Sequence, residues 1–286
     1  TRVRSSAASD VYKRQASAGA GGGGGGGGVV TAGFGAGGGG VGIYGNSSFQ
    51  ATTSPGFYAY SFDSSGDRLS ITSLPGPGTA TDFTYEAWVF PTTSNVVYRT
   101  IFGIDNYGSG AAFRLYQYGT SFQYWYNGSG GSIDSPAVLI NRWHHLAITR
   151  AGTAIRFFVN GVQVGSTVTT SVNHPTSNFR IGNHVGGVNG FVGLISNLRV
   201  INGTAVYTTN FGVPIEPLTA IANTVLLTAQ DTSFRDNSTN NYLISDLGEV
   251  LTVNQFPFSI LGGGGNGGVS SATLGGGGGG GSGGSA

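Results

Sequence analysis

The sequence of 286 residues contains no cysteine, no methionine and few charged residues, which make up only 9% of the chain. Without cysteine there can be no disulfide framework and no thiolate-ligated metal. The formal charge of +1 arises from the first 15 residues, which hold four basic residues against one acidic residue, whereas the rest carries 9 arginines against 11 acidic residues, with no lysine. That remainder has no basic stripe to neutralise phosphates, so we do not expect nucleic-acid binding.

Long apolar runs are also missing, so we expect no membrane span and no secretory signal peptide. Methionine is absent even from position 1, which predicts that the sequence is a piece of a longer protein. Residues 1–15 resemble a translated library adaptor, with a genuine basic tail as the alternative. We exclude them from the predicted fold.

Glycine is abundant, and its distribution divides the chain. Of 54 glycines, 18 lie in residues 16–56 and 15 in residues 262–286. The segments 16–56 and 259–286 are therefore predicted to be glycine-rich and of low complexity. Flexible linkers are one interpretation, and polyglycine helices packed in a fibre tip are another. Residues 57–258 contain no internal linker and are predicted to form one domain.

Within that domain, short runs rich in Val, Ile, Phe, Tyr and Thr alternate with Gly, Asn, Pro and Ser. This pattern predicts strands near 57–62, 67–73, 83–90, 99–104, 111–118, 121–127, 143–150, 154–159, 162–167, 178–182, 191–201, 224–230, 241–245 and 250–256. No window of 11 residues sustains a helical apolar stripe, and residues 204–207 form a turn at most. The expected fold is all-β, a two-sheet antiparallel sandwich.

Turn sequences predict the register of the hairpins. Asn160-Gly161 is a strong hairpin signal and should pair Val159 with Val162 and Phe157 with Val164. Ala151-Gly152 should likewise set Ile148 against Ile155 and Leu146 against Phe157. The opposite face of these strands then presents His145, Arg156 and Phe158. Gly119-Thr120 fits a type II′ turn whose hairpin has Arg114, Tyr116, Tyr118 and Trp125 on its outward face.

In the strand 83–89 the apolar face is Phe83, Tyr85, Ala87 and Val89, which leaves Glu86 and Trp88 outside. If all these strands share one sheet, the outward residues form a single concave strip: Arg114, Tyr116, Tyr118, Trp125, Trp88, His145, Arg156 and Phe158. Aromatic rings stack on the C–H faces of sugars while Arg and His bond the hydroxyls, so this strip is the candidate ligand site. A purely structural role for the same residues is the alternative, since exposed aromatic pairs stabilise sheets and a subunit contact could cover them.

Four segments together resemble a laminin-G-like (concanavalin A-like lectin/glucanase) jelly-roll domain: Phe62-Asp-Ser-Ser-Gly-Asp-Arg-Leu-Ser-Ile71, Asp82-Phe-Thr-Tyr-Glu-Ala-Trp-Val89, Trp143-His-His-Leu-Ala-Ile-Thr-Arg150 with Phe158-Val-Asn-Gly-Val-Gln-Val-Gly165, and Gly193-Leu-Ile-Ser-Asn-Leu-Arg-Val200. A narrower likeness, to virion and tail-associated proteins of marine bacteriophages, rests on Asn202-Gly-Thr-Ala-Val-Tyr207, Pro217-Leu-Thr-Ala, Leu226-Leu-Thr and Asp236-Asn-Ser-Thr-Asn-Asn-Tyr242. The resemblance implies a surface or tail-fibre module of the virion or another extracellular site. Its implied partners are glycans, such as host cell-surface polysaccharide, and other virion proteins.

Related retaining glycosidases carry their nucleophile and acid/base on a Glu-x-Asp-x-Glu strand. The three glutamates here, Glu86, Glu216 and Glu249, lie in no such motif. We therefore expect no enzyme, with Glu86 pairing with an arginine instead, and keep a laminarinase-like hydrolase as a distant alternative. His144 should point inward as a hydrogen-bonded core histidine, opposite in direction to His145, so the two cannot chelate one ion.

Some laminin-G-like domains bind calcium at the rim of the sandwich through Asp side chains and backbone carbonyls. Asp105 and Asn106, after the strand that ends at residue 104, are the best candidates here, and Asp134 is a weaker one. Loop Asp and Asn also form turns without any metal. We expect no other cofactor. The sequence thus predicts a non-catalytic carbohydrate- or surface-binding module of a phage fibre or virion protein, with a purely structural decoration or assembly domain as the second hypothesis.

Overall fold

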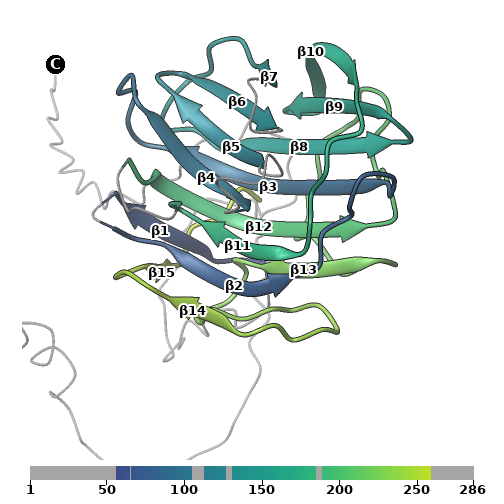
Figure 1. The fold of residues 1–286 in the computed structure, drawn as a ribbon. Coiled ribbons are helices and arrows are strands. Elements are labelled where there is room, and N and C mark those ends of the chain that lie inside the picture. Colours follow the sequence, from purple (N-terminus) through teal and green to yellow (C-terminus); the bar gives the residue numbers. More distant parts are fainter. Residues whose placement is uncertain (1–55, 65, 105–112, 127–130, 185–188, 259–286) are drawn as a thin grey trace, which may run out of the picture. The chain divides into compact units, whose positions relative to one another are not determined.

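A computed structural model gives the fold of the chain (Figure 1). It describes residues 56–64, 66–104, 113–126, 131–184 and 189–258. Three sequence-based predictions lie outside these residues: the adaptor-like segment 1–15, the glycine-rich segments up to residue 55 and from 259 onward, and the candidate calcium ligands Asp105 and Asn106.

The described residues form two antiparallel sheets. Sheet A has eight strands in the order β10-β9-β8-β3-β12-β1-β15, with β13 also pairing with β12. Its strands are β1 (Ala59–Asp63), β3 (Phe83–Pro91), β8 (His144–Ala151), β9 (Ala154–Val159), β10 (Val162–Thr169), β12 (Val192–Asn202), β13 (Thr224–Thr228) and β15 (Leu251–Val253). Sheet B has seven strands in the order β14-β2-β11-β4-β5-β6-β7. Its strands are β2 (Leu69–Leu74), β4 (Tyr98–Ile104), β5 (Phe113–Tyr118), β6 (Ser121–Tyr126), β7 (Gly131–Asp134), β11 (Ser177–Ile181) and β14 (Ile244–Asp246).

The predicted all-β sandwich is confirmed, and each predicted range overlaps one observed strand. The sequence pattern missed β7, a four-residue strand with the sequence Gly-Ser-Ile-Asp, because its single large apolar residue gives no alternation. The part of the chain that the structure describes contains no helix that could cross a membrane.

Two of the three predicted hairpins have the expected register. Asn160 and Gly161 both have positive φ, 52° and 78°, as a type I′ turn requires, and Val159 pairs with Val162. Gly119 has φ 59°, and Arg114 pairs with Trp125 across its hairpin as predicted.

The register predicted for the third hairpin is wrong by two residues. Leu146 pairs with Val159 rather than Phe157, and Ile148 pairs with Phe157 rather than Ile155. The turn residues are Gly152, with φ 60°, and the following threonine, so Ala151 belongs to the strand. Because side chains alternate with period two, a shift of two residues keeps every side chain on its predicted face.

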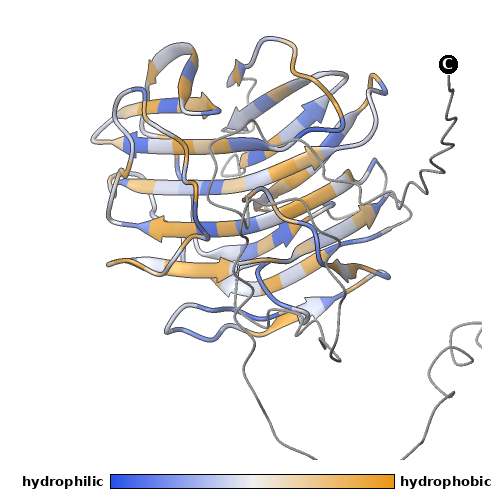
Figure 2. Ribbon diagram, turned by 180° about the vertical axis from the view of Figure 1, so that it is seen from behind, coloured by the Kyte–Doolittle hydropathy of each residue, from blue (hydrophilic) through white to orange (hydrophobic). Residues whose placement is uncertain are grey.

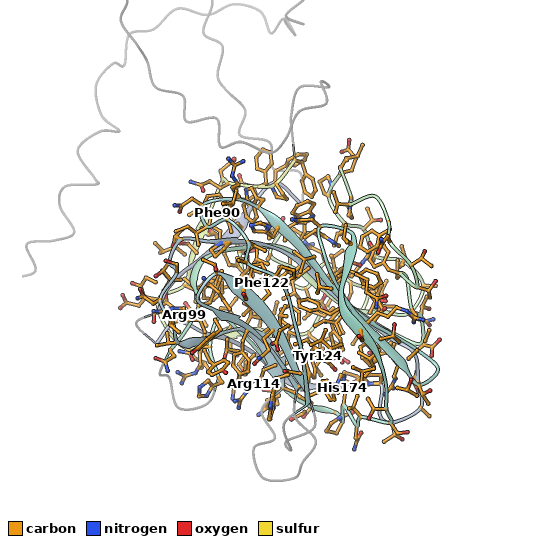
Figure 3. All side chains as sticks on the ribbon, turned by 90° about the horizontal axis from the view of Figure 1, so that it is seen from above. Phe90, Arg99, Arg114, Phe122, Tyr124 and His174 are labelled. Carbon is orange, nitrogen blue, oxygen red and sulfur yellow. The ribbon has the colours of Figure 1, made fainter. Side chains whose placement is uncertain are left out.

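The hydrophobic core fills the space between the two sheets. Hydrophobic and hydrophilic residues alternate along most strands, as Figure 2 shows, so each sheet turns one apolar face inward. The predicted inward residues of β3 and the hairpin residue Phe157 are all buried in this core. The buried imidazole of His174 lies among these core residues: its ring contacts Phe113 at 4.3 Å between centroids and bonds the Tyr124 hydroxyl at 3.0 Å (Figure 3).

Part of the outer face of sheet A is also buried. Glu86 and Trp88 face outward from β3 as predicted, but they are buried rather than exposed to solvent. The segment 203–223, which connects β12 to β13, covers this face, since Tyr207 and Phe211 pack over it. A strand covered on both sides has no solvent-facing residues, and all nine residues of β3 are buried.

Candidate ligand-binding face

The single concave strip predicted from the sequence does not exist. Four of its members lie on sheet A and four on sheet B: Trp88, His145, Arg156 and Phe158 on β3, β8 and β9, and Arg114, Tyr116, Tyr118 and Trp125 on β5 and β6. All eight turn away from the core, and the outer faces of two stacked sheets point in opposite directions. The two groups cannot contact one ligand.

On sheet A, the predicted ligand residues are covered by protein. The rings of Tyr207 and Phe211 stack on each other at 3.6 Å, and the Phe211 ring lies 5.7 Å from His145 and 5.3 Å from Phe158. Both His145 and Phe158 have no exposed surface, and Trp88 is 7% exposed. The structure contradicts the prediction that these three contact a ligand. Phe211 covers His145 and Phe158, and Trp88 packs against Phe258 at 6.0 Å between ring centroids, so none of the three presents a surface to a ligand.

Glu86 is the centre of a buried ionic cluster beneath that segment. Arg199 of β12 donates from Nε and Nη2 to Glu86 Oε1, at 2.8 and 2.6 Å. The other carboxylate oxygen contacts His145 Nε2 at 3.1 Å and accepts the Tyr207 hydroxyl at 2.9 Å. Burial alone would raise the pKa of Glu86, but the hydrogen bonds and charges of His145 and Arg199 outweigh it and lower the pKa. The predicted pairing of Glu86 with an arginine is confirmed.

His144, the neighbour of His145, points inward as predicted and is almost fully buried. Its Nε2 lies 2.7 Å from the Leu139 carbonyl and its Nδ1 lies 3.0 Å from Asn160 Nδ2. Burial lowers its pKa, although the hydrogen bond to Leu139 acts in the opposite direction. His144 is therefore a structural residue that ties β8 to the Asn160-Gly161 turn.

On sheet B, the predicted residues do share one outer face with each other. In the register of the sheet, Arg114 stands between Gly103 of β4 and Trp125 of β6. A side chain at Gly103 would collide with Arg114, since an added Cβ would lie 2.9 Å from the Arg114 Cγ. The glycine thus leaves room for the arginine, which is buried and donates from Nη1 to the Tyr116 hydroxyl at 3.0 Å (Figure 3 labels Arg114).

Three tyrosines form the next part of this face. The rings of Tyr98 and Tyr118 stack at 4.4 Å with an interplanar angle of 29°, and Tyr116 meets Tyr98 edge-on at 5.5 Å. Tyr98 is 49% exposed and Tyr118 39% exposed, whereas Tyr116 and Trp125 are half-buried. These aromatic rings are accessible to solvent, whereas Arg114 beside them is buried. Because its guanidinium donates to the Tyr116 hydroxyl, the arginine positions Tyr116.

Polar groups border the rings on the β7 side. Gln123 of β6 pairs with Asp134 of β7, and its Nε2 donates to Asp134 Oδ1 at 2.5 Å. Ser132 donates to the other carboxylate oxygen at 3.3 Å. Asp134 is therefore engaged by side chains of its own sheet. No group of three or more His, Cys, Asp or Glu side chains within the described ranges could hold a metal ion.

We define the aromatic face by the residues that the register brings together on the outside of β4, β5, β6 and β7: Tyr98, Arg114, Tyr116, Tyr118, Gln123, Trp125, Ser132 and Asp134. The sequence reasoning missed Tyr98 and Gln123. The position of Gln123 followed from the Gly119-Thr120 turn, whereas that of Tyr98 depends on the pairing of β4 with β5, which no local signal fixes.

Comparison with known proteins agrees with this architecture. A laminin G family model, described as the concanavalin A-like lectin/glucanases superfamily, matches residues 63–206. No curated protein matches the sequence. Among solved structures, a protein from Bacteroides ovatus, provisionally described as a carbohydrate-binding protein, aligns with a TM-score of 0.52 at 19% identity. The alignment covers 72% of this chain and 62% of that protein, less than two thirds of its length.

Two further structures are more distant. The heptameric SAP-like pentraxin of Limulus polyphemus aligns with a TM-score of 0.42 at 18% identity, over 53% of this chain and 78% of its own. Domains LG4-5 of the mouse laminin alpha1 chain align with a TM-score of 0.41 at 18% identity, over 56% of this chain and 47% of theirs. Identities this low show only a common fold. The family model, in contrast, matches the sequence from the end of β1 to beyond β12. The chain belongs to the concanavalin A-like lectin/glucanases superfamily.

Proposed function

We propose that the domain is a non-catalytic carbohydrate-binding module and that the aromatic face of sheet B is its ligand surface. The observation that carries this proposal is the exposure of the stacked Tyr98 and Tyr118 rings next to Tyr116 and Trp125. Sugars present apolar C–H faces that stack on such rings, and their hydroxyls bond to neighbouring amides and carboxylates. Gln123 and Asp134 supply such groups at the edge of the rings.

The environment of the glutamates supports a non-catalytic role. A retaining glycosidase needs two carboxyl groups about 5–5.5 Å apart, on either side of the sugar bond. The carboxylate of Glu86 has no exposed surface and is occupied by Arg199, His145 and Tyr207. Glu216 and Glu249 are exposed and lie in two separate connections, the first before β13 and the second before β15. A laminarinase-like activity has little support in this arrangement.

We place the module on a virion surface or another extracellular structure, with host polysaccharide and other virion proteins as partners. This part of the proposal is supported by the likeness of segments 202–207 and 236–242 to marine phage proteins. The description of the Bacteroides ovatus neighbour is in line with glycan binding. A second candidate function is that of a structural decoration domain, since the stack of Tyr98 on Tyr118 also stabilises the pairing of β4 with β5.

The test is a glycan array with residues 57–258, followed by titration of the best oligosaccharide against wild type and Trp125→Ala. Trp143→Ala is the matched control, because Trp143 is also half-buried but packs against Phe90 on the outer face of sheet A. We expect Trp125→Ala to lose binding while its stability falls by only about 1 kcal/mol. Trp143→Ala should retain binding.

Equal affinity in all three proteins would refute the aromatic face as the ligand surface. Absence of any bound glycan, together with self-assembly of the domain, would favour the decoration function. Release of reducing sugar from the bound oligosaccharide would contradict the non-catalytic proposal.

A further inference from the structure

A second candidate site lies on the outer side of sheet A, whereas the aromatic face belongs to sheet B. It is an open cavity of about 510 Å³ between the segment 217–220 and the segment 235–241. Leu227 of β13 is at its base, and this residue pairs with Arg199, whose side chain also points outward from sheet A. The cavity therefore opens on the opposite side of the sandwich from Trp125.

The base of the cavity is built from a chain of buried amides. Gln230, which is 2% exposed, donates from Nε2 to Asn197 Oδ1 and to the Leu218 carbonyl, both at 2.7 Å. Its Oε1 accepts from Asn237 Nδ2 at 3.2 Å. The backbone N–H of Asn237 is also fixed, by the Leu227 carbonyl at 2.6 Å. The Asn237 amide is thus held in place from below, while its Oδ1 accepts no hydrogen bond from the described residues.

The one carboxylate among the described lining residues is already fully hydrogen-bonded. Asp236 is 2% exposed, and its Oδ1 accepts from the backbone N–H groups of Leu227 and Ser238 at 3.1 and 2.9 Å. Its Oδ2 accepts from the Ser238 hydroxyl and from the Tyr242 N–H, each at 2.9 Å. Four donors leave this carboxylate no capacity for a ligand, so the motif Asp236–Tyr242 shapes the loop.

Arg235 supplies a positive charge in the lining that a ligand could contact. Arg235 is exposed, and among the residues that the structure describes none pairs with its guanidinium. The exposed Thr219 and Asn241 add polar groups at the opposite walls. None of the described residues that line the cavity carries an aromatic ring, so a ligand would be held through hydrogen bonds and charge rather than through stacking.

We infer that this cavity binds an acidic sugar unit, carrying either a carboxylate or a sulfate ester. Arg235 binds the anionic group through its planar fork, and the amides of Asn237 and Asn241 bond the ring hydroxyls. The volume is within the range of small-molecule sites. The inference rests on the proposed glycan-binding function but not on the aromatic face.

The test uses the full chain and three oligosaccharide probes of equal length: oligogalacturonate, which is carboxylated, a sulfated galactan and a neutral galactan. Affinities are measured by calorimetry for wild type, Arg235→Gln and Arg142→Gln. Arg142 is an exposed arginine outside the cavity lining, so its substitution removes the same charge elsewhere. A fourth protein, Trp125→Ala, reports on the aromatic face alone.

We expect wild type to bind an acidic probe and Arg235→Gln to bind it at least about tenfold more weakly, whereas Arg142→Gln should leave that affinity unchanged. The acidic probe that shows this pattern identifies the anionic group. Equal losses in the two arginine variants would reveal unspecific charge attraction and overturn the site, as would unchanged affinity in Arg235→Gln. Binding of an acidic probe that is lost only in Trp125→Ala would overturn this site while sparing the proposed function, and absence of any glycan binding would overturn both.

Discussion

Replacing Arg199 by methionine should test the buried ionic cluster on the outer face of sheet A. The substitution keeps most of the side-chain volume but removes both hydrogen bonds to Glu86 Oε1. It leaves a carboxylate with no exposed surface that retains only His145 and Tyr207 as partners. Removing one member of a buried ion pair typically costs about 3–5 kcal/mol, because the remaining charge stays desolvated. We expect a loss of that size in urea denaturation at pH 7.

Arg156→Met is the matched control. Arg156 also points outward from sheet A, but it is only partly buried and forms no ion pair with any described residue. Its replacement should cost less than about 1 kcal/mol. Equal losses for the two variants, or a loss below about 1 kcal/mol for Arg199→Met, would refute the view that Glu86 depends on its arginine.

The same pair of proteins should differ in pH dependence. In wild type the pKa of Glu86 lies below its ordinary value of 4.5, so its contribution to stability is complete above pH 4.5 and is lost as the pH falls below that value. Without Arg199, burial should raise the pKa of Glu86, and protonation on acidification would then stabilise the folded variant. The difference in unfolding free energy between wild type and Arg199→Met should therefore shrink as the pH falls from 7 to 4.5, and a constant difference would contradict this.

Further predictions concern residues of the core. Phe157→Ala should reduce the unfolding free energy by about 3–5 kcal/mol in urea denaturation, because Phe157 is fully buried. Gln163 faces outward from the hairpin, so Gln163→Ala should reduce it by less than about 0.5 kcal/mol, and the reverse order would contradict the observed register. Burial and the charge of Arg150 lower the pKa of His174 to about 3, so NMR should show no titration of its ring between pH 7 and 5. Because the unfolded chain takes up this proton near pH 6.5 and the folded protein does not, the unfolding free energy should decrease progressively as the pH falls below 6.5. Residues 57–258 should melt cooperatively on their own in calorimetry, and a molten product would show that the glycine-rich flanks complete the sandwich.

The sequence predicted local features well because short signals determine them. Asn160-Gly161 specifies a type I′ turn through the backbone conformation that it requires, and the faces of both flanking strands follow from it. The turn at Gly152 shows the limit of this reasoning. Two registers that differ by two residues place the same side chains on the same faces, so alternation alone could not choose between them.

Long-range pairing was not accessible from the sequence, and the candidate site depended on it. β3 pairs with β8 and β12, whereas β5 pairs with β4 and β6, so the predicted concave strip was divided between two sheets. The burial of His145 was missed for a similar reason. The covering residues Tyr207 and Phe211 lie in a connection without strand or helix periodicity, and only the folded chain reveals what they pack against.

The central claim is that glycan binds to the aromatic face, and mapping of amide chemical shifts tests it most directly. Residues 57–258, labelled with nitrogen-15, would be titrated with the strongest oligosaccharide from the array. We predict the largest shifts along β4, β5 and β6, around Tyr98, Tyr118 and Trp125. Saturable shifts confined to the loops at the rim of the sandwich, with β4–β6 unaffected, would contradict the claim.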